Sequence, residues 1–413
     1  MNEAAPRTLR WFWLVLYTLA VGLALLLLFV TLQERPFDPV ALRHFPADLL
    51  ARGRQFSREV RVAATLNYLI SVAVMLWLCF WPGGARLMQR LEALGRGRFW
   101  AGAMAVVVGL MLISTLVDLP FACYLELWHE KAYGVSHQTL GGWLAEQGKS
   151  LLVGLITGSL FYLPILWMIR RWPRRWWIPA SLMNWAFSGL MVLLYPVVLM
   201  PLFHELRPVE DPALHAMIER LADRAGVQVE AIREIKVSHE TSRANAMVTG
   251  LGPTKQVIFY DTLLQQFTPD EVEVVMAHEL AHAAYRDVVA SWLLGGLGEV
   301  VIFWAAAWML RRSVDVAPLS LPAPHAPRGL ALLFLFLMLA GQVSAPLHNT
   351  ISRRAEVRAD SFALKVTGNP DAFVSTFLKL AQGNPGDVDP HPVVEFLSHS
   401  HPSITSRIRA AER

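Results

Sequence analysis

The chain has 413 residues, of which 54% are hydrophobic and only 17% are charged, and its mean hydropathy is +0.38. Soluble globular proteins carry about 25% charged residues, so this composition excludes an ordinary soluble protein and indicates a membrane protein. The formal net charge is +4. The arginines and lysines lie mostly beside apolar segments, which favours membrane anchoring over nucleic-acid binding.

Seven apolar segments are long enough to cross a membrane, which takes about 20 residues in a helix. They are 11–32, 63–82, 101–122, 151–169, 178–200, 288–310 and 329–350. The first segment follows Arg7 and Arg10, as the core of a secretory signal would. Its apolar run is longer than a typical signal core, and no small-residue cleavage site follows, so we expect a retained span.

Two polar stretches are long enough to fold outside the bilayer, and two spans separate them, so they lie on the same side. We therefore expect a division of the chain into 1–200 (spans one to five with their loops), 201–287 (first part of a catalytic domain), 288–350 (spans six and seven) and 351–413 (second part of that domain).

The polar stretches show both helical and strand patterns. Apolar residues from Leu214 to Ala225 recur at helical spacing, and Gly226 follows as a stop signal. Three β-prone runs come next, at 232–237, 244–249 and 255–260, and the last two are separated by a turn that contains Gly and Pro. The external domain is therefore predicted to be α+β.

The main chemical signal is His278-Glu279-Leu280-Ala281-His282. Thr268 followed three residues later by Glu271 is a capping box, so the motif is predicted to lie on a helix. Imidazoles four residues apart project from one face of a helix and can bind one metal ion. Glu279 lies beside them, placed to accept a proton from water rather than to ligate the metal.

Catalytic zinc normally takes three protein ligands and keeps one position open, so a third ligand is needed. Glu356 and Asp360 follow the seventh span and are four residues apart on a predicted helix. One carboxylate can reach the metal while the other hydrogen-bonds a ligating imidazole. In isolation these acids, with Arg353, Arg354 and Arg358 nearby, would indicate a solvated helix face; the motif on the same membrane side favours the metal role.

These motifs, with Ser400-His401-Pro402 near the C-terminus, resemble the type I CAAX prenyl proteases, integral-membrane zinc endopeptidases of the gluzincin group. Segments such as Tyr260-Asp261-Thr262-Leu263-Leu264 extend the resemblance over most of the chain. It implies seven transmembrane helices that enclose a chamber, with an α+β, gluzincin-like zinc metalloprotease domain at its mouth. After His282 the chain departs from the eukaryotic members, which affects the expected prenyl-substrate specificity but not the metal ligands.

The resemblance also implies roles for single residues. His278, His282 and Glu356 would bind one Zn²⁺ per chain. Glu279 would be the general base and then the general acid. Asp360 would orient a ligating imidazole, with His278 as the first candidate. His401 would donate a hydrogen bond to the oxyanion, although the residues alone do not separate it from His391 and His399. Asn245 would bind the peptide backbone at an edge strand, and an ordinary strand or turn asparagine is the alternative.

The expected function is that of an integral-membrane zinc metalloendopeptidase whose substrate is a peptide or protein, with C-terminal processing of lipidated CAAX proteins implied by the resemblance. An Arg-rich, Lys-poor composition is typical of a GC-rich bacterial source, where prenylated substrates need not exist. Membrane-protein quality control is therefore the alternative protease function. A transporter or scaffold with structural zinc is the alternative of another class, but structural zinc takes four Cys or His ligands and no fourth is evident.

The orientation in the membrane is not decided by charge. Lys and Arg residues are balanced between the two sides, so the positive-inside rule gives no answer. The resemblance alone places the active site on the cytoplasmic side, and the Arg-rich composition indicates that the membrane is a bacterial inner membrane. The physiological substrate, the oligomeric state and the substrate entry route stay open.

Overall fold

The computed structural model describes residues 4–413. Within this range, seven helices are long and apolar enough to cross a membrane. They are Arg7–Thr31, Ala47–Phe80, Phe99–Ala132, Leu140–Arg171, Trp177–Phe203, Asp287–Arg312 and Pro327–Thr367. The seven predicted spans are thereby confirmed, and each helix extends past its apolar segment at one end or both.

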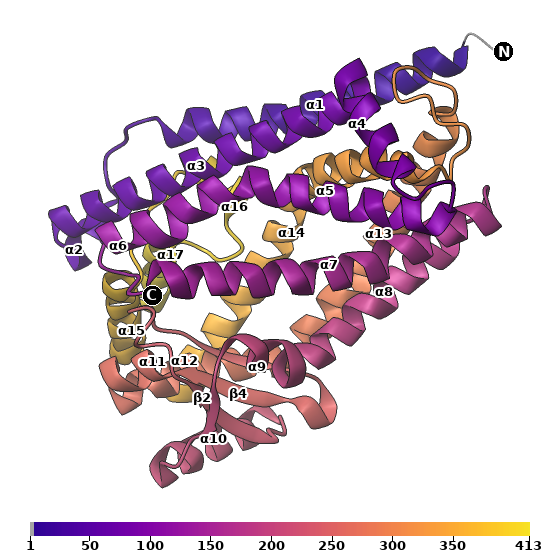
Figure 1. Ribbon diagram of the computed structural model, residues 1–413. Helices are drawn as coiled ribbons and strands as arrows, with labels where there is room; N and C mark the ends of the chain where they lie inside the picture. Colours follow the sequence, from indigo (N-terminus) through magenta and orange to yellow (C-terminus); the bar gives the residue numbers. More distant parts are fainter. Residues whose placement is uncertain (1–3) are drawn as a thin grey trace.

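The long helices of the membrane region lie side by side in one bundle (Figure 1). Each long helix touches the next along the chain, and the last returns to the first. The elements are α1 (Ala4–Thr31), α2 (Pro39–His44), α3 (Ala47–Phe80), α4 (Pro82–Ala93), α5 (Phe99–Ala122), η1 (Cys123–His129), α6 (Glu130–Ala132), α7 (Leu140–Arg171), α8 (Trp177–Leu194), η2 (Tyr195–Leu199), α9 (Met200–Phe203), α13 (Asp287–Arg312), η4 (Pro327–Gly329) and α14 (Leu330–Thr367).

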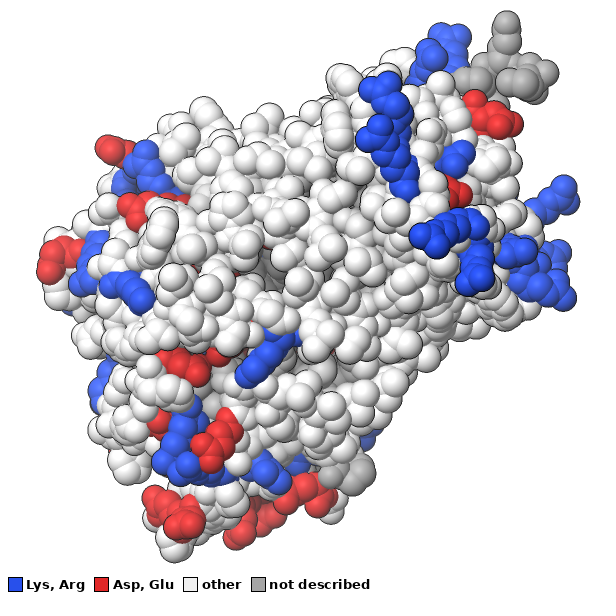
Figure 2. Space-filling view, in the orientation of Figure 1, with Lys and Arg blue, Asp and Glu red and all other residues white. Residues whose placement is uncertain are grey.

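The main apolar core of the spans lies in the half that is remote from the polar domain. The residues of this core lie at the start of α5 and α14 and at the end of α3, α7 and α13, as Val106, Leu333, Leu78, Ile165 and Ala307 illustrate. The other halves leave large apolar side chains uncovered. Figure 2 shows an opening in this apolar surface. The uncovered apolar side chains and the opening agree with the expected chamber.

Charged side chains gather at the two ends of the molecule and leave a broad uncharged band between them (Figure 2). This is the distribution that a membrane-spanning protein requires, because an exposed charge in hydrocarbon is costly.

The polar domain is built on a four-stranded sheet with the order β1-β2-β4-β3. The strands are β1 (Leu206–Pro208), β2 (Ala231–Ile235), β3 (Ala246–Thr249) and β4 (Gln256–Tyr260), and the 3₁₀ turn η3 (Gly252–Thr254) joins the last two. β4 is parallel to β2 and antiparallel to β3, which leaves β3 at the edge. Three strands and the hairpin were expected; β1 was not.

One expected boundary is wrong. The strand predicted over 244–249 begins at Ala246, so Asn245 lies just before it rather than inside it. The backbone nitrogen of Tyr260 still donates to the carbonyl of Asn245 at 2.9 Å, which continues the β3–β4 pairing by one residue.

Helices cover the sheet and join it to the membrane region. They are α10 (Pro212–Ala225), α11 (Asp261–Gln266), α12 (Pro269–Ala284), α15 (Pro370–Gly383), α16 (Pro392–Ser398) and α17 (Ile404–Ala411). α10 ends at Gly226, whose φ of 64° suits glycine. Ile218, Phe259 and Phe373 are fully buried in the domain core. Because α14 runs without a break from the last span to Thr367, it crosses the expected division at 350/351; the domain limits stay a prediction.

Candidate active site

The helix that carries the His-Glu-x-x-His motif begins as the sequence indicates. The Glu271 carboxylate accepts from the Thr268 backbone nitrogen at 2.7 Å, and the Thr268 hydroxyl accepts from the Glu271 nitrogen at 3.4 Å. Lys379 and Ser375 on α15 also bond the buried Glu271 carboxylate, at 2.7 and 2.5 Å. These contacts hold the pKa of Glu271 below its ordinary value although burial raises it. The start of α12 is therefore tied to α15.

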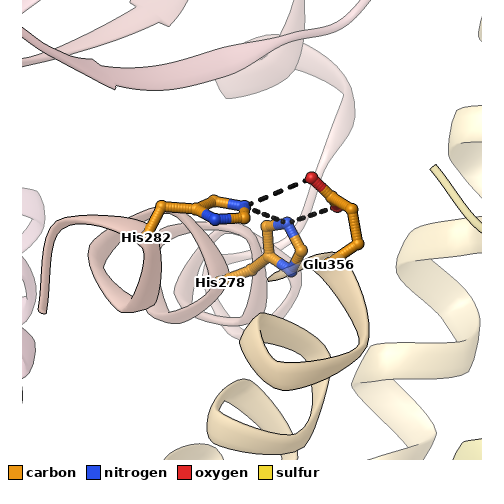
Figure 3. A group of neighbouring side chains, drawn as sticks. All are labelled: His278, His282 and Glu356. Carbon is orange, nitrogen blue, oxygen red and sulfur yellow. Dashed lines mark hydrogen bonds and ion pairs between the residues drawn. The ribbon is translucent and has the colours of Figure 1, made fainter. Parts of the chain in front are cut away.

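Three side chains converge at one point between α12 and α14 (Figure 3). His278 Nε2 lies 3.2 Å from His282 Nε2 and 3.2 Å from Glu356 Oε2, and His282 Nε2 lies 3.4 Å from Glu356 Oε1. The two histidines are one turn apart on α12, and Glu356 comes from the extension of α14 beyond the membrane. Their ligand atoms all lie within 4.8 Å of one another.

These separations fit a metal ion of zinc's size. Ligand atoms about 2.1 Å from a tetrahedral ion lie about 3.4 Å from each other, close to the measured separations. Glu356 Oε2 is buried and has no hydrogen-bond partner, although an imidazole nitrogen is near. Two facing Nε2 atoms and a carboxylate oxygen without a hydrogen-bond partner are three possible ligand atoms around one point, which a cation would satisfy.

A second layer of charges holds the first imidazole. Asp360 Oδ1 lies 2.9 Å from His278 Nδ1, so this carboxylate fixes the ring with Nε2 directed at Glu356. Both oxygens of Asp360 are bonded in turn by the guanidinium of Arg407 on α17. Burial lowers the pKa of His278, but the neighbouring carboxylates of Asp360 and Glu356 outweigh burial and raise that pKa to about 9.

The second imidazole has its own carboxylate, on the next helix. Asp287, the first residue of α13, lies with Oδ2 2.9 Å from His282 Nδ1. Its other oxygen pairs with the guanidinium of Arg358. Each candidate ligand histidine is therefore bonded through Nδ1 to a carboxylate that an arginine neutralises, which leaves both Nε2 atoms for a metal.

Glu279 and Asn245 face a common pocket of about 300 Å³. His278, His401, Ala246 and Asn384 also line it. Burial raises the pKa of Glu279 above its ordinary value. A carboxyl of this kind is a stronger base than one in water, and base catalysis is most effective when the pKa is near the working pH.

Of the three histidines near the C-terminus, His401 is the one that reaches the triad. Its Nε2 lies 3.2 Å from Glu356 Oε1, and its Nδ1 lies 2.9 Å from the Ser400 hydroxyl. If the hydroxyl donates to Nδ1, the ring proton stays on Nε2 and can be donated to substrate. His391 instead caps α16, with Nδ1 accepting from Val393. His399 is held neutral, because burial and the nearby Arg61 and Arg353 lower its pKa to about 4.

Comparison with known proteins finds two sequence families along the chain. The family described as Peptidase family M48 matches residues 208–413. The family described as CAAX prenyl protease N-terminal, five membrane helices, matches residues 33–205. The metalloprotease YhfN of Bacillus subtilis is 31% identical over 358 residues, which cover 84% of this chain and 83% of that protein. The chain belongs to peptidase family M48.

Other relatives agree with this assignment. CAAX prenyl protease 1 of Saccharomyces cerevisiae is 29% identical, over 73% of this chain and 70% of that protein, and its homolog in Arabidopsis thaliana is 27% identical, over 81% and 78%. The crystal structure of S. mikatae Ste24p has the same fold, with a TM-score of 0.84 at 24% identity over 96% of this chain and 98% of that one. This M48 chain is a multi-pass membrane metalloprotease related to the CAAX prenyl proteases.

Two residues of the M48 site were missed from sequence. Asp287 is the first acid after His282 and opens the next span, which was a usable signal. No signal in the sequence points to Arg407, because it meets Asp360 only when α17 folds back on α14.

Proposed function

We propose that this chain is a zinc-dependent endopeptidase in which His278, His282 and Glu356 hold the metal. The observation that carries the proposal is the set of ligand-atom separations of 3.2, 3.2 and 3.4 Å. Zinc bound there would supply a Lewis acid that polarises a carbonyl and lowers the pKa of water to about 7.

The chain's own residues would perform the proton transfers. Glu279 accepts a proton from the attacking water and returns it to the leaving amine, for which its raised pKa is suited. His401 donates from Nε2 to the oxygen on which negative charge develops. Asp360 and Asp287 keep the two imidazoles oriented, and each carboxylate is in turn paired with an arginine, Arg407 and Arg358.

The peptide would add to the sheet at β3. This strand is an edge of the sheet and borders the pocket that holds Glu279. Main-chain hydrogen bonds to an edge strand bind an extended peptide regardless of its side chains, and Asn245 at the start of the strand offers its carboxamide for a further bond.

For the substrate we propose C-terminal processing of a CAAX-type protein, lipidated at the cysteine. Relatives named CAAX prenyl protease 1 support this class, and the uncovered apolar side chains of the spans offer surface for a lipid. We place the site on the cytoplasmic side of a bacterial inner membrane. Labelling of a single cysteine introduced at exposed Asp270, in intact cells and in inverted vesicles, tests the orientation.

The decisive experiment uses purified protein and a peptide with a fluorophore and a quencher. Wild type should contain one zinc per chain and cleave the peptide, a chelator should abolish cleavage, and Glu279→Gln should keep the zinc and be inactive. Cleavage by Glu279→Gln at the wild-type rate would refute the proposed base. Zinc without any cleavage would favour a structural metal.

A further inference from the structure

β3 lies at the edge of the sheet, and alternate residues along it direct their backbone groups away from β4. Tyr260 donates to the carbonyl of Asn245, so Asn245 faces β4. In an antiparallel pair, alternate residues direct their N–H and C=O groups to the partner and away from it. Ala244, Ala246 and Val248 therefore direct their backbone groups to the free edge, where a peptide would add.

The edge is closed at Ala244 by one side chain. The Asn384 carboxamide lies against this residue, with Oδ1 accepting from the Ala244 nitrogen at 3.2 Å and Nδ2 donating to the Ala244 carbonyl at 3.2 Å. A carboxamide bonded in this way takes both positions that a paired strand would use. The Asn384 side chain therefore replaces a neighbouring strand at one residue, Ala244.

The edge is also closed before Ala244, by the loop between α6 and α7. The Ser242 nitrogen donates to the Val135 carbonyl at 2.9 Å, and the His137 nitrogen donates to the Glu240 carbonyl at 2.7 Å. What stays open is the part at Ala246 and Val248. Ala246 and Glu279 line the same pocket, so the open part lies beside the candidate base.

We propose that Asn384, backed by residues 135–137, is a stop that limits how far a substrate chain extends on the C-terminal side of the scissile bond. The inference rests on the proposed function and names its substrate class more closely. A peptide antiparallel to β3, the slightly more stable arrangement, carries its C-terminal side toward Ala244, where it meets the stop. The site therefore selects bonds that lie a few residues from a C-terminus, and the N-terminal side of the substrate is not restricted.

The stop is anchored to the membrane region rather than being a loose loop. The Asn384 nitrogen bonds the Leu380 carbonyl at 2.8 Å, and the following loop packs on α3. A methyl group added at Gly53 of α3 would lie 2.3 Å from the Gly386 carbonyl oxygen, so the two backbones touch. The Asp387 nitrogen donates to the Ser57 hydroxyl at 2.8 Å, and Arg61 lies 3.7 Å from the Asp387 carboxylate.

Two peptide series test the proposal on the zinc-loaded, full-length enzyme. Both contain one cleavable sequence; one series is lengthened stepwise at the C-terminus and the other at the N-terminus. Products are identified by mass spectrometry and kcat/KM is measured. We expect kcat/KM in the C-terminal series to fall about tenfold once the peptide reaches Ala244, because the two hydrogen bonds to Asn384 must be displaced. In the N-terminal series we expect kcat/KM to stay unchanged.

Asn384→Ala should bring kcat/KM for the long C-terminal peptides close to the value for the short one. Asn384→Ser, which can bond one group of Ala244 but not both, should give an intermediate ratio and serves if the alanine variant does not fold. The matched control is Asn369→Ala, which removes a carboxamide that caps the other end of α15. This variant should keep the wild-type ratio of kcat/KM for the long peptides to kcat/KM for the short one. Zinc content and cleavage of the short peptide report folding.

The outcomes separate the two proposals. Equal cleavage of all C-terminal lengths by wild type would overturn the stop and leave the peptidase function standing. A length limit that persists unchanged in folded Asn384→Ala would also overturn the assignment to Asn384. Absence of cleavage of every peptide would overturn the proposed function, and the stop with it.

Discussion

Asp287→Ala tests the construction of the metal centre through a residue that lies outside the motif. Asp287 Oδ2 is 2.9 Å from His282 Nδ1, and only 9% of the residue is exposed. The substitution removes the acceptor that fixes the tautomer and orientation of His282. Loss of such a partner weakens metal binding about 10–100-fold, which corresponds to about 1.4–2.7 kcal/mol.

The other contact of Asp287 contributes little to this loss. The Arg358 side chain is 47% exposed, so it stays solvated without its partner, and a pair of this kind contributes at most about 1 kcal/mol, to folding rather than to zinc affinity. Asp287→Asn keeps the shape and one acceptor. A neutral acceptor makes a hydrogen bond about half as strong, so we expect a loss between wild type and Asp287→Ala.

Zinc affinity is measured by competition with a chelator, and kcat at saturating zinc. kcat should stay near the wild-type value, because Glu279 and His401 are untouched. Asp270→Ala is the control, since it removes an exposed acid from the first turn of α12 that has no histidine partner. Equal zinc affinity in wild type, Asp287→Ala and Asp270→Ala would refute the orienting role.

Four further predictions address the remaining site residues. His278→Ala, His282→Ala and Glu356→Ala should each lose zinc in a metal-to-protein assay, whereas Glu279→Gln keeps it; full metal in Glu356→Ala would move the third-ligand role to another acid. Asp360→Asn should weaken zinc binding about 10–100-fold, and an unchanged affinity would make Asp360 a structural partner of Arg407 alone. His401→Ala should keep zinc and KM but lose about 10²–10³ in kcat, with His391→Ala and His399→Ala near wild type; a large loss in His399→Ala instead would shift the assignment by two residues. Because burial raises the pKa of Glu279 above 4.5, kcat/KM of the zinc-loaded enzyme should fall as the pH drops through that raised value, where the carboxyl becomes protonated and no longer accepts a proton; an acid limb at the ordinary value would contradict this.

Local signals predicted the spans and the metal helix. The spans follow from apolar length, which the bilayer thickness dictates, and α12 follows from the capping box at Thr268. Glu356 and Asp360 were recognisable as neighbours on one helix face, because helical spacing is local. These features need no knowledge of which distant segments meet.

Features that depend on distant contacts could not be predicted. β1 has three residues, ends in Pro208 and exists only because it pairs with β2. β3 begins two residues later than expected, because the backbone of Ala244 is bonded by the side chain of Asn384 and not by another strand. The partnership of Arg407 with Asp360 joins residues 47 positions apart.

The membrane spans themselves belong to the positioning of the metal centre. Asp287, which holds His282, is the first residue of α13, and Glu356 and Asp360 lie on the continuous helix α14. Metal–ligand distances tolerate errors of only about 0.2 Å, so both helices must keep their places for the three ligand atoms to stay at their measured separations. α12, which carries the histidines, packs directly on α14, and α13 packs on α14 as well, so both contacts support the distance between Glu356 and the histidines. A catalytic domain cut free of its spans would keep the motif but lose the packing that supports α13 and α14, the helices on which Asp287 and Glu356 lie.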